Sequence, residues 1–251
     1  MSNHYHLLLI PPNALQLALF MAFVNSNIAR EAGRLHDWRA RFWQTRYSHI
    51  PVTDEEASQV ERLAYLLAQG CKEGLVASPL DWPGVSGVRA RLEGRVLRGI
   101  WIDRTAQYRA RLRGSDHGLE AVTREEVLDL APLPCWAHLS RREYNRRYAD
   151  LVKRVEHAAR VQAEQTGRDS LGAAAVVRHD PHFHPNRVKT APMPWVHAAS
   201  KASREAFREA YRLFLAAYRR AADKLRAGVL TASFPAGSFP PPRRFVGLAY
   251  T

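Results

Sequence analysis

Two histidines near the start of the chain have the spacing of a metal-binding pair. His4 and His6 flank Tyr5 in a segment, Tyr5–Ile10, that reads as a short buried strand. A strand points alternate residues to the same face, so both imidazoles would point the same way and could hold one metal ion. An isolated His-x-His pair is also common for purely structural reasons, and that alternative stays open here.

A tyrosine and a glutamine further along the chain could complete such a site. Tyr65 and Gln69 are four residues apart in a segment predicted to be helical, so they share one face of the helix. A glutamine amide oxygen can be a third metal ligand, and a neighbouring phenol can be a nucleophile. The alternative is a surface tyrosine beside a surface glutamine. A different face of the helix is apolar and is predicted to pack: Val60, Leu63, Ala64 and Leu67.

The elements that must position these residues can be outlined from local patterns. Pro11 and Pro12 end the predicted strand, and Asn13 can cap a helix that reaches about Arg34. Residues 42–50 are aromatic-rich and roughly alternating, so we expect them to be extended.

The helix that carries Tyr65 has clear predicted ends. Thr53 and Glu56 have the spacing of a capping box, and Gly74 supplies a stop after about Lys72. Two further helices are predicted, over residues 140–165 and 200–226. The second of these has an apolar seam: Phe207, Tyr211, Phe214, Tyr218, Ala221 and Leu225.

The charge balance points to a polyanionic partner. The 251 residues contain 37 Lys and Arg against 24 Asp and Glu, a formal net charge of +13. Such a basic chain favours nucleic acid, although a solvated basic surface is the alternative. Arginines concentrate in residues 88–114 and 140–165 and could follow DNA phosphates. Four aromatic residues lie among them and could either stack on bases or pack in the core: Trp101, Tyr108, Tyr144 and Tyr148.

Other classes of protein are disfavoured by composition. Two cysteines, Cys71 and Cys135, do not make a disulfide framework, so a reducing cytosol is expected. No apolar run approaches the roughly 20 residues of a membrane span, and the N-terminus does not read as a signal peptide.

Four motifs in order resemble those of the REP-associated tyrosine transposases, of the single-tyrosine HUH transposase superfamily. The resemblance covers about the first 90 residues, and all four motifs in this order make it specific. They are the HUH-like His4-Tyr5-His6, the segment Trp43–Tyr47, the tyrosine helix Tyr65–Val76, and Asp81–Ser86.

The resemblance implies an α+β fold with a ferredoxin-like HUH nuclease core over residues 1–98, followed by a basic, mainly helical extension over 99–251. It also implies that Tyr65 is the nucleophile and that His4, His6 and Gln69 bind a divalent metal. Two imidazoles favour Mn²⁺, while cellular abundance could make Mg²⁺ the working ion. The predicted DNA-binding arginines are Arg46, Arg89, Arg91, Arg95, Arg98, Arg146 and Arg147.

By the same resemblance, the protein would cleave and rejoin single-stranded, hairpin-bearing DNA through a 5′-phosphotyrosine link, as in DNA transposition. No membrane partner is expected, and a homodimer is an open alternative. The chain departs from the family at Gly70, where a proline is common. Because family members carry a strand–helix–strand portion before the HUH strand, we expect a core that lacks it and an exposed sheet edge.

Other functions stay open from the sequence. A truncated, catalytically impaired relative would bind structured single-stranded DNA without cutting it. A metal-dependent hydrolase of another class is disfavoured because the carboxylate and histidine motifs of such enzymes are missing. A second metal site at His179, Asp180, His182 and His184 is disfavoured because prolines interrupt the motif.

Overall fold

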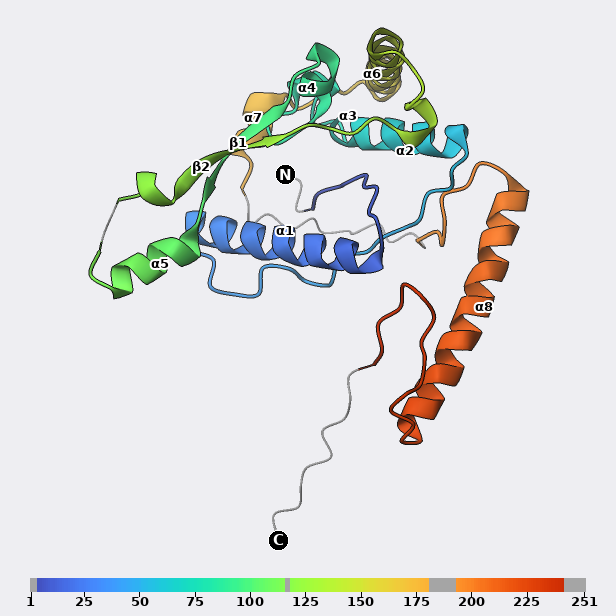
Figure 1. Ribbon diagram of the computed structural model, residues 1–251. Helices are drawn as coiled ribbons and strands as arrows, with labels where there is room; N and C mark the ends of the chain where they lie inside the picture. Colours follow the sequence, from blue (N-terminus) through green and yellow to red (C-terminus); the bar gives the residue numbers. More distant parts are fainter. Residues whose placement is uncertain (1–3, 116–117, 181–192, 242–251) are drawn as a thin grey trace. The chain divides into compact units, whose positions relative to one another are not determined.

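The computed structural model describes residues 4–115, 118–180 and 193–241 (Figure 1). These residues divide into two compact units. The first unit holds residues 4–7 and 54–180, and the second holds residues 8–53 and 193–241. The expected nucleophile, Tyr65, and the three expected metal ligands, His4, His6 and Gln69, all belong to the first unit. The boundary predicted after residue 98 rests on the family resemblance and stays a prediction.

The first unit is mainly helical. Its α-helices are α2 (Glu56–Leu67), α3 (Gln69–Lys72), α4 (Val88–Glu93), α5 (Arg104–Leu112), α6 (Arg141–Thr166) and α7 (Ala173–Arg178). Three short 3-10 turns connect them, η1 (Pro79–Asp81), η2 (Glu120–Val122) and η3 (Pro134–Trp136). The predicted helix over residues 140–165 is confirmed as α6, and Ser140 and Glu143 form a capping box at its start.

The core of the first unit lies where α6 crosses α2 and α3 (Figure 1). Leu63 and Leu67 from α2 pack there, with Val60 and Ala64 partly buried beside them, as the apolar pattern predicted. Leu151 of α6 is only 1% exposed. Burial of this α2 face directs the opposite face, which carries Tyr65, away from the core.

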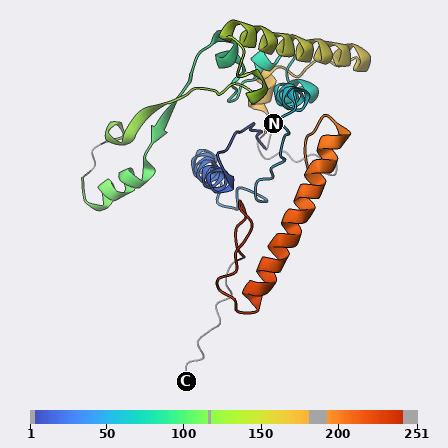
Figure 2. The ribbon, with the colours of Figure 1, turned by 45° about the vertical axis from the view of Figure 1, so that its right-hand side comes forward.

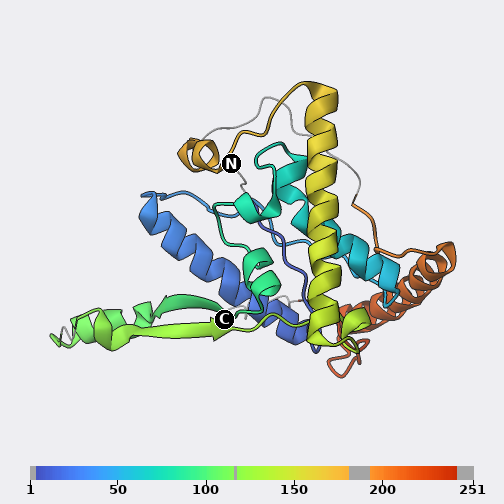
Figure 3. The ribbon, with the colours of Figure 1, turned by 90° about the horizontal axis from the view of Figure 1, so that it is seen from above.

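The first unit also contains one antiparallel sheet of two strands. β1 (Leu97–Ile102) pairs with β2 (Thr123–Leu128) in a register that sets Leu97 opposite Leu128 and Ile102 opposite Thr123. Helix α5 lies in the connection between the two strands (Figures 2 and 3). The predicted α+β class is therefore confirmed, but a ferredoxin-like sheet is not, since β1 and β2 are the only strands among the described residues.

The strand predicted at the histidines is wrong for the described chain. Residues 5–10 are in neither a strand nor a helix. An isolated strand leaves its backbone donors and acceptors unpaired, and no other described strand pairs with this segment. The predicted extended segment at residues 42–50 likewise forms no strand.

The second unit contains two long helices. In α1 (Ala14–Leu35) the Asn13 side chain accepts a hydrogen bond from the Gln16 backbone N–H, so the predicted cap is confirmed. In α8 (Lys201–Arg226), Ser200 caps the start. The predicted apolar seam is present as stacked rings of Phe207, Tyr211 and Phe214. No helix among the described residues is long and apolar enough to cross a membrane.

The start of α2 differs from its prediction. The helix begins at Glu56, and its N-cap, Glu55, makes no side-chain capping bond. Thr53 instead donates its hydroxyl to the backbone carbonyl of His197, so the predicted capping box is wrong. Thr53 and His197 both belong to the second unit, where their backbones are also hydrogen bonded. The Thr53 hydroxyl is thus bonded to a residue distant in sequence and does not cap α2.

Gly70 has a packing role that its sequence context did not indicate. A Cβ atom at this position would lie 2.9 Å from Trp82 Cε3 and 3.0 Å from Val76 Cγ2. The backbone of α3 can therefore approach the Trp82 ring only because residue 70 has no side chain. The predicted stop at Gly74 is confirmed, since α3 ends at Lys72 and Gly74 has φ +67°.

We expect Gly70→Ala to destabilise the protein by about 1–3 kcal/mol, because the added methyl group overlaps the Trp82 ring. Urea denaturation followed by tryptophan fluorescence measures this change. Gly99→Ala is the control, since no heavy atom lies within 4 Å of the added Cβ atom and its φ is not positive. Equal stabilities for the two variants would contradict the close contact.

Candidate functional site

The first unit brings together the four residues selected from the sequence. The ring centroids of His4 and His6 are 4.9 Å apart, with the rings edge to face. The His6 ring lies edge to face with Tyr65 at 6.0 Å. Gln69 forms a side-chain hydrogen bond with His6. The predicted grouping is therefore present although the predicted strand is not.

The helical break after α2 holds Gln69 in place. Helix α2 ends at Leu67 and α3 starts at Gln69, so Gln69 begins a new turn. Its Nε2 donates a hydrogen bond of 3.0 Å to the backbone carbonyl of Tyr65. With its nitrogen committed to Tyr65, the amide can offer its oxygen to His6.

The protonation of His6 is shifted by its surroundings. Desolvation by neighbouring protein atoms is the main cause, and the charge of His4 adds to it, so the pKa of His6 lies below its ordinary value of 6.5. The hydrogen bond with Gln69 opposes this change. The neutral imidazole is thereby favoured at neutral pH, and this is the form that binds a metal.

The causes of this shift give a test of the cluster. In an NMR titration of the histidine ring protons, we expect His6 to titrate below pH 6.5. His4→Ala removes a neighbouring positive charge and should raise the midpoint. Gln69→Ala removes the hydrogen bond that favours the charged ring and should lower it. A midpoint that neither variant moves would show that the three side chains are not in contact.

Two cations that were not selected from the sequence flank the tyrosine. Arg62 Cζ lies 5.0 Å from the centroid of the Tyr65 ring, and Lys72 Nζ lies 5.2 Å from it. Both positions fall at helical spacing from Tyr65, three residues before it and seven after it. That spacing is a signal that could have found them in the sequence.

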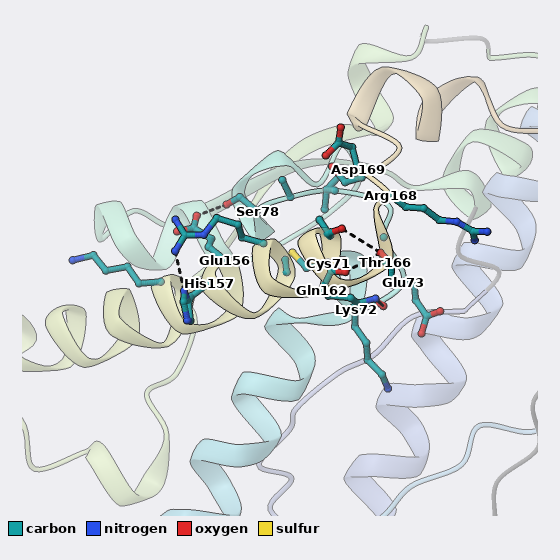
Figure 4. A pocket seen from close by; sticks show the side chains of 18 residues that line it. Cys71, Lys72, Glu73, Ser78, Glu156, His157, Gln162, Thr166, Arg168 and Asp169 are labelled. Carbon is teal, nitrogen blue, oxygen red and sulfur yellow. Dashed lines mark hydrogen bonds between the residues drawn. The ribbon is translucent and has the colours of Figure 1, made fainter.

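A groove of about 1220 Å³ opens between α3 and α6 beside this cluster (Figure 4). Two hydrogen bonds join residues that line the groove. The Gln162 side chain of α6 donates one to the backbone carbonyl of Lys72, and the Ser78 hydroxyl donates the other to the Glu156 carboxylate. The basic residues that line the groove are Lys72, Lys153, Arg160 and Arg168, and the acidic ones are Glu73, Glu156 and Asp169. Figure 4 shows the side chains of Lys72 and Arg168 directed away from the groove, at its rim. Lys72 thus belongs to both the groove and the surroundings of Tyr65.

The cysteine nearest the tyrosine is not equipped to be a nucleophile. Cys71 is buried and unpaired. Burial, together with the carboxylates of Glu156 and Asp81, raises its pKa to about 11, so the thiol stays protonated at neutral pH. Cys135 is also unpaired.

The predicted DNA-binding arginines have mixed surroundings. In the first unit, Arg146 is exposed and has no salt bridge or hydrogen bond with another described residue. The others have partners within the protein: Arg89 with the Leu80 carbonyl, Arg91 with the Tyr144 ring, Arg95 with Glu93, Arg98 with Glu125, and Arg147 with Glu56. Arg46 is exposed and belongs to the second unit. DNA contact by these residues stays a prediction.

Two of the aromatic residues considered for base stacking are core residues. Tyr144 and Tyr148 of α6 are 7% and 5% exposed and pack in the core of the first unit. Tyr108 on α5 is 63% exposed and remains accessible, while Trp101 on β1 is partly buried. Base stacking by Tyr144 or Tyr148 is therefore ruled out in this fold.

His4, His6 and Gln69 carry two imidazoles and one amide, which are side-chain types that bind divalent metals. Metal binding by these three residues stays a prediction. Within residues 4–115, 118–180 and 193–241 there is no group of three His, Cys, Asp or Glu side chains with metal-binding placement. For the second motif, His182 and His184 lie outside the described residues.

The comparisons with known proteins give no relative for this chain. No protein family matches it, and no curated protein or solved structure matches it significantly. The family resemblance therefore rests on the four sequence motifs, and the function rests on the site.

Proposed function

We propose that the protein is a transposase-like DNA strand transferase related to the REP-associated tyrosine transposases. It cleaves and rejoins single-stranded, hairpin-bearing DNA, with Tyr65 as the nucleophile and His4, His6 and Gln69 as ligands of a divalent metal. The ferredoxin-like organisation of the core is part of this proposal.

The observation that carries the proposal is the gathering of His4, His6, Tyr65 and Gln69 in one compact unit. About 60 residues separate the histidines from the tyrosine helix, yet the His6 and Tyr65 rings lie 6.0 Å apart and Gln69 is hydrogen bonded to His6. The net charge of +13 supports a polyanionic substrate.

The covalent step follows from the phenol of Tyr65. Its oxygen forms a bond to the phosphorus of a phosphodiester, and the bond from that phosphorus to the preceding 3′ oxygen breaks. The phenol proton passes to solvent, and the leaving oxygen takes up a proton to become a 3′-OH. Attack by another 3′-OH on the phosphotyrosine reverses the step and joins strands. The number of phosphoester bonds is conserved, so no ATP is required.

The three proposed ligands have a supporting role. His4, His6 and Gln69 would hold a divalent ion, which would supply positive charge to the phosphate oxygens. His6 stays neutral at neutral pH because its pKa is lowered. The Gln69 amide is held in place by the hydrogen bond that it donates to the Tyr65 carbonyl. The imidazole of His6 lies edge to face with the phenol ring.

The groove between α3 and α6 is the proposed path of the DNA strand. Lys72, beside Tyr65, stands at its rim, and Lys153 and Arg160 of α6 line it. Because α6 forms one wall, the basic region after residue 98 would contribute directly to substrate binding.

The decisive experiment uses single-stranded hairpin DNA labelled at either end. We expect the protein, with Mn²⁺ or Mg²⁺, to form a denaturation-resistant adduct that retains the label on the 3′ side of the cut. The other fragment should end in a free 3′-OH. Tight binding without any adduct would instead favour the alternative of a relative that only binds DNA. Adduct formation at the same rate in excess chelator would remove the metal from the proposal.

Binding to single-stranded DNA should weaken strongly with salt. If three or four phosphates are contacted, the affinity should fall by about twenty- to fiftyfold between 50 and 200 mM NaCl. Fluorescence anisotropy with a labelled oligonucleotide measures this. A flat salt response would contradict binding through the cationic side chains.

Two adjacent arginines provide a matched comparison in the same titration. Arg146→Gln should weaken binding and reduce the salt dependence, because Arg146 is exposed and has no described salt-bridge partner. Arg147→Gln should affect binding less, because Arg147 is already paired with Glu56 at 2.9 Å and lies over the Trp136 ring. Equal effects would show that the internal pairing does not matter.

A further inference from the structure

Four polar side chains form one stripe along α2 and α3. Arg62, Tyr65, Gln69 and Lys72 follow each other at spacings of three, four and three residues. The two end members are cations, and both approach the Tyr65 ring, at 5.0 Å for Arg62 and 5.2 Å for Lys72. The phenol is therefore flanked by two positive charges, one from the turn before it and one from beyond the break after α2.

Arg62 carries a hydrogen-bond donor that the described protein leaves unsatisfied. Its side chain is 18% exposed, and one terminal nitrogen pairs with the exposed Glu61 at 2.7 Å. Its Nε is buried and has no hydrogen-bond partner. A buried donor without an acceptor is costly. A ligand can reach only the exposed part of the guanidinium, where the terminal nitrogen meets Glu61.

The positive charge of Lys72 is not paired with a carboxylate among the described residues. No described acidic side chain lies within ion-pair distance of its Nζ, and its backbone carbonyl is fixed by Gln162 of α6. Guanidinium and ammonium groups are the two side chains most used to bind phosphate. The pair beside Tyr65 thus has the chemistry of an anion site, and it is formed by residues other than the proposed metal ligands.

We propose that Arg62 and Lys72 form a phosphate-binding site over Tyr65. The site holds the phosphodiester beside the phenol, with a terminal N–H of Arg62 donating to one oxygen and Lys72 neutralising another. This inference rests on the proposed function for the identity of the attacking group. The binding of phosphate itself does not depend on that function.

The first test measures adduct formation at saturating DNA. Removing one preorganised donor to the reacting phosphate lowers the rate of such reactions by about a hundredfold or more. We expect Arg62→Ala and Lys72→Ala each to show a loss of this order, with Lys72→Arg retaining more activity than Lys72→Ala. Arg219→Ala, an exposed arginine of α8 in the second unit, is the control and should react at the wild-type rate.

The second test does not require cleavage and uses the full-length wild-type chain. The Arg62 Nε–H resonance, assigned by its loss in Arg62→Lys, should shift when inorganic phosphate is added and should shift less in Lys72→Ala. A wild-type protein that forms no adduct but shows this shift would retain the phosphate site and lose the proposed strand transfer. A resonance that phosphate leaves unmoved, or alanine variants that form the adduct at the wild-type rate, would overturn the phosphate site.

Discussion

We expect Tyr65→Phe to abolish the proposed covalent DNA–protein adduct while leaving the affinity for single-stranded DNA within about twofold of wild type. The variant loses only the phenolic oxygen, and the ring can keep its contacts with His6, Arg62 and Lys72. A denaturing gel of labelled DNA detects the adduct, and fluorescence anisotropy measures binding. The effect is all or none because no other group on the α2 stripe can form the same phosphoester.

A matched control separates this loss from a general effect of removing a hydroxyl group. Tyr108→Phe changes an exposed tyrosine of α5 and should form the adduct normally. An adduct that persists in Tyr65→Phe would assign the nucleophile to another tyrosine and would end the proposed role of Tyr65. Cys71 does not offer a substitute, because its pKa is raised to about 11 in the core.

We expect Leu151→Ala to lower the free energy of unfolding of the first unit by about 3 kcal/mol, within the range of 2–5 kcal/mol for buried leucines. Leu151 is 1% exposed and lies in the cluster that joins α6 to α2 and α3. Removing its side chain leaves a cavity in the core that supports the Tyr65 helix. Urea denaturation measures the change, and most of the effect arises from lost packing.

Arg154→Ala on the same helix is the control for Leu151→Ala. Its side chain is exposed, so we expect a change within about 0.5 kcal/mol. Similar stabilities for the two variants would mean that α6 does not pack on α2 and α3 as described. The rate of adduct formation should also fall in Leu151→Ala, because α6 supports the backbone at Lys72 through Gln162.

Several features were predictable from the sequence because they depend on nearby residues. The Asn13 cap, the helices α6 and α8, and the apolar face of α2 all follow from local hydrogen bonding and helical periodicity. The pairing of Tyr65 with Gln69 is of the same kind, since four residues make slightly more than one helical turn.

Other local patterns were misleading because distant residues decided the outcome. The capping box at Thr53 is replaced by a hydrogen bond to the His197 carbonyl, 144 residues away in the chain. The strand at residues 5–10 is not formed, because β structure depends on a pairing partner that the segment itself does not encode.

The sequence by itself determined the residue types of the candidate site and the helical face shared by Tyr65 and Gln69. Only the tertiary structure decided that His6 meets Gln69, that Arg62 and Lys72 flank the phenol, and that Tyr144 and Tyr148 are buried. The physical reason is the range of the interactions. Helical periodicity is fixed within a few residues, whereas burial and the meeting of separate segments depend on how α6 packs across α2 and α3.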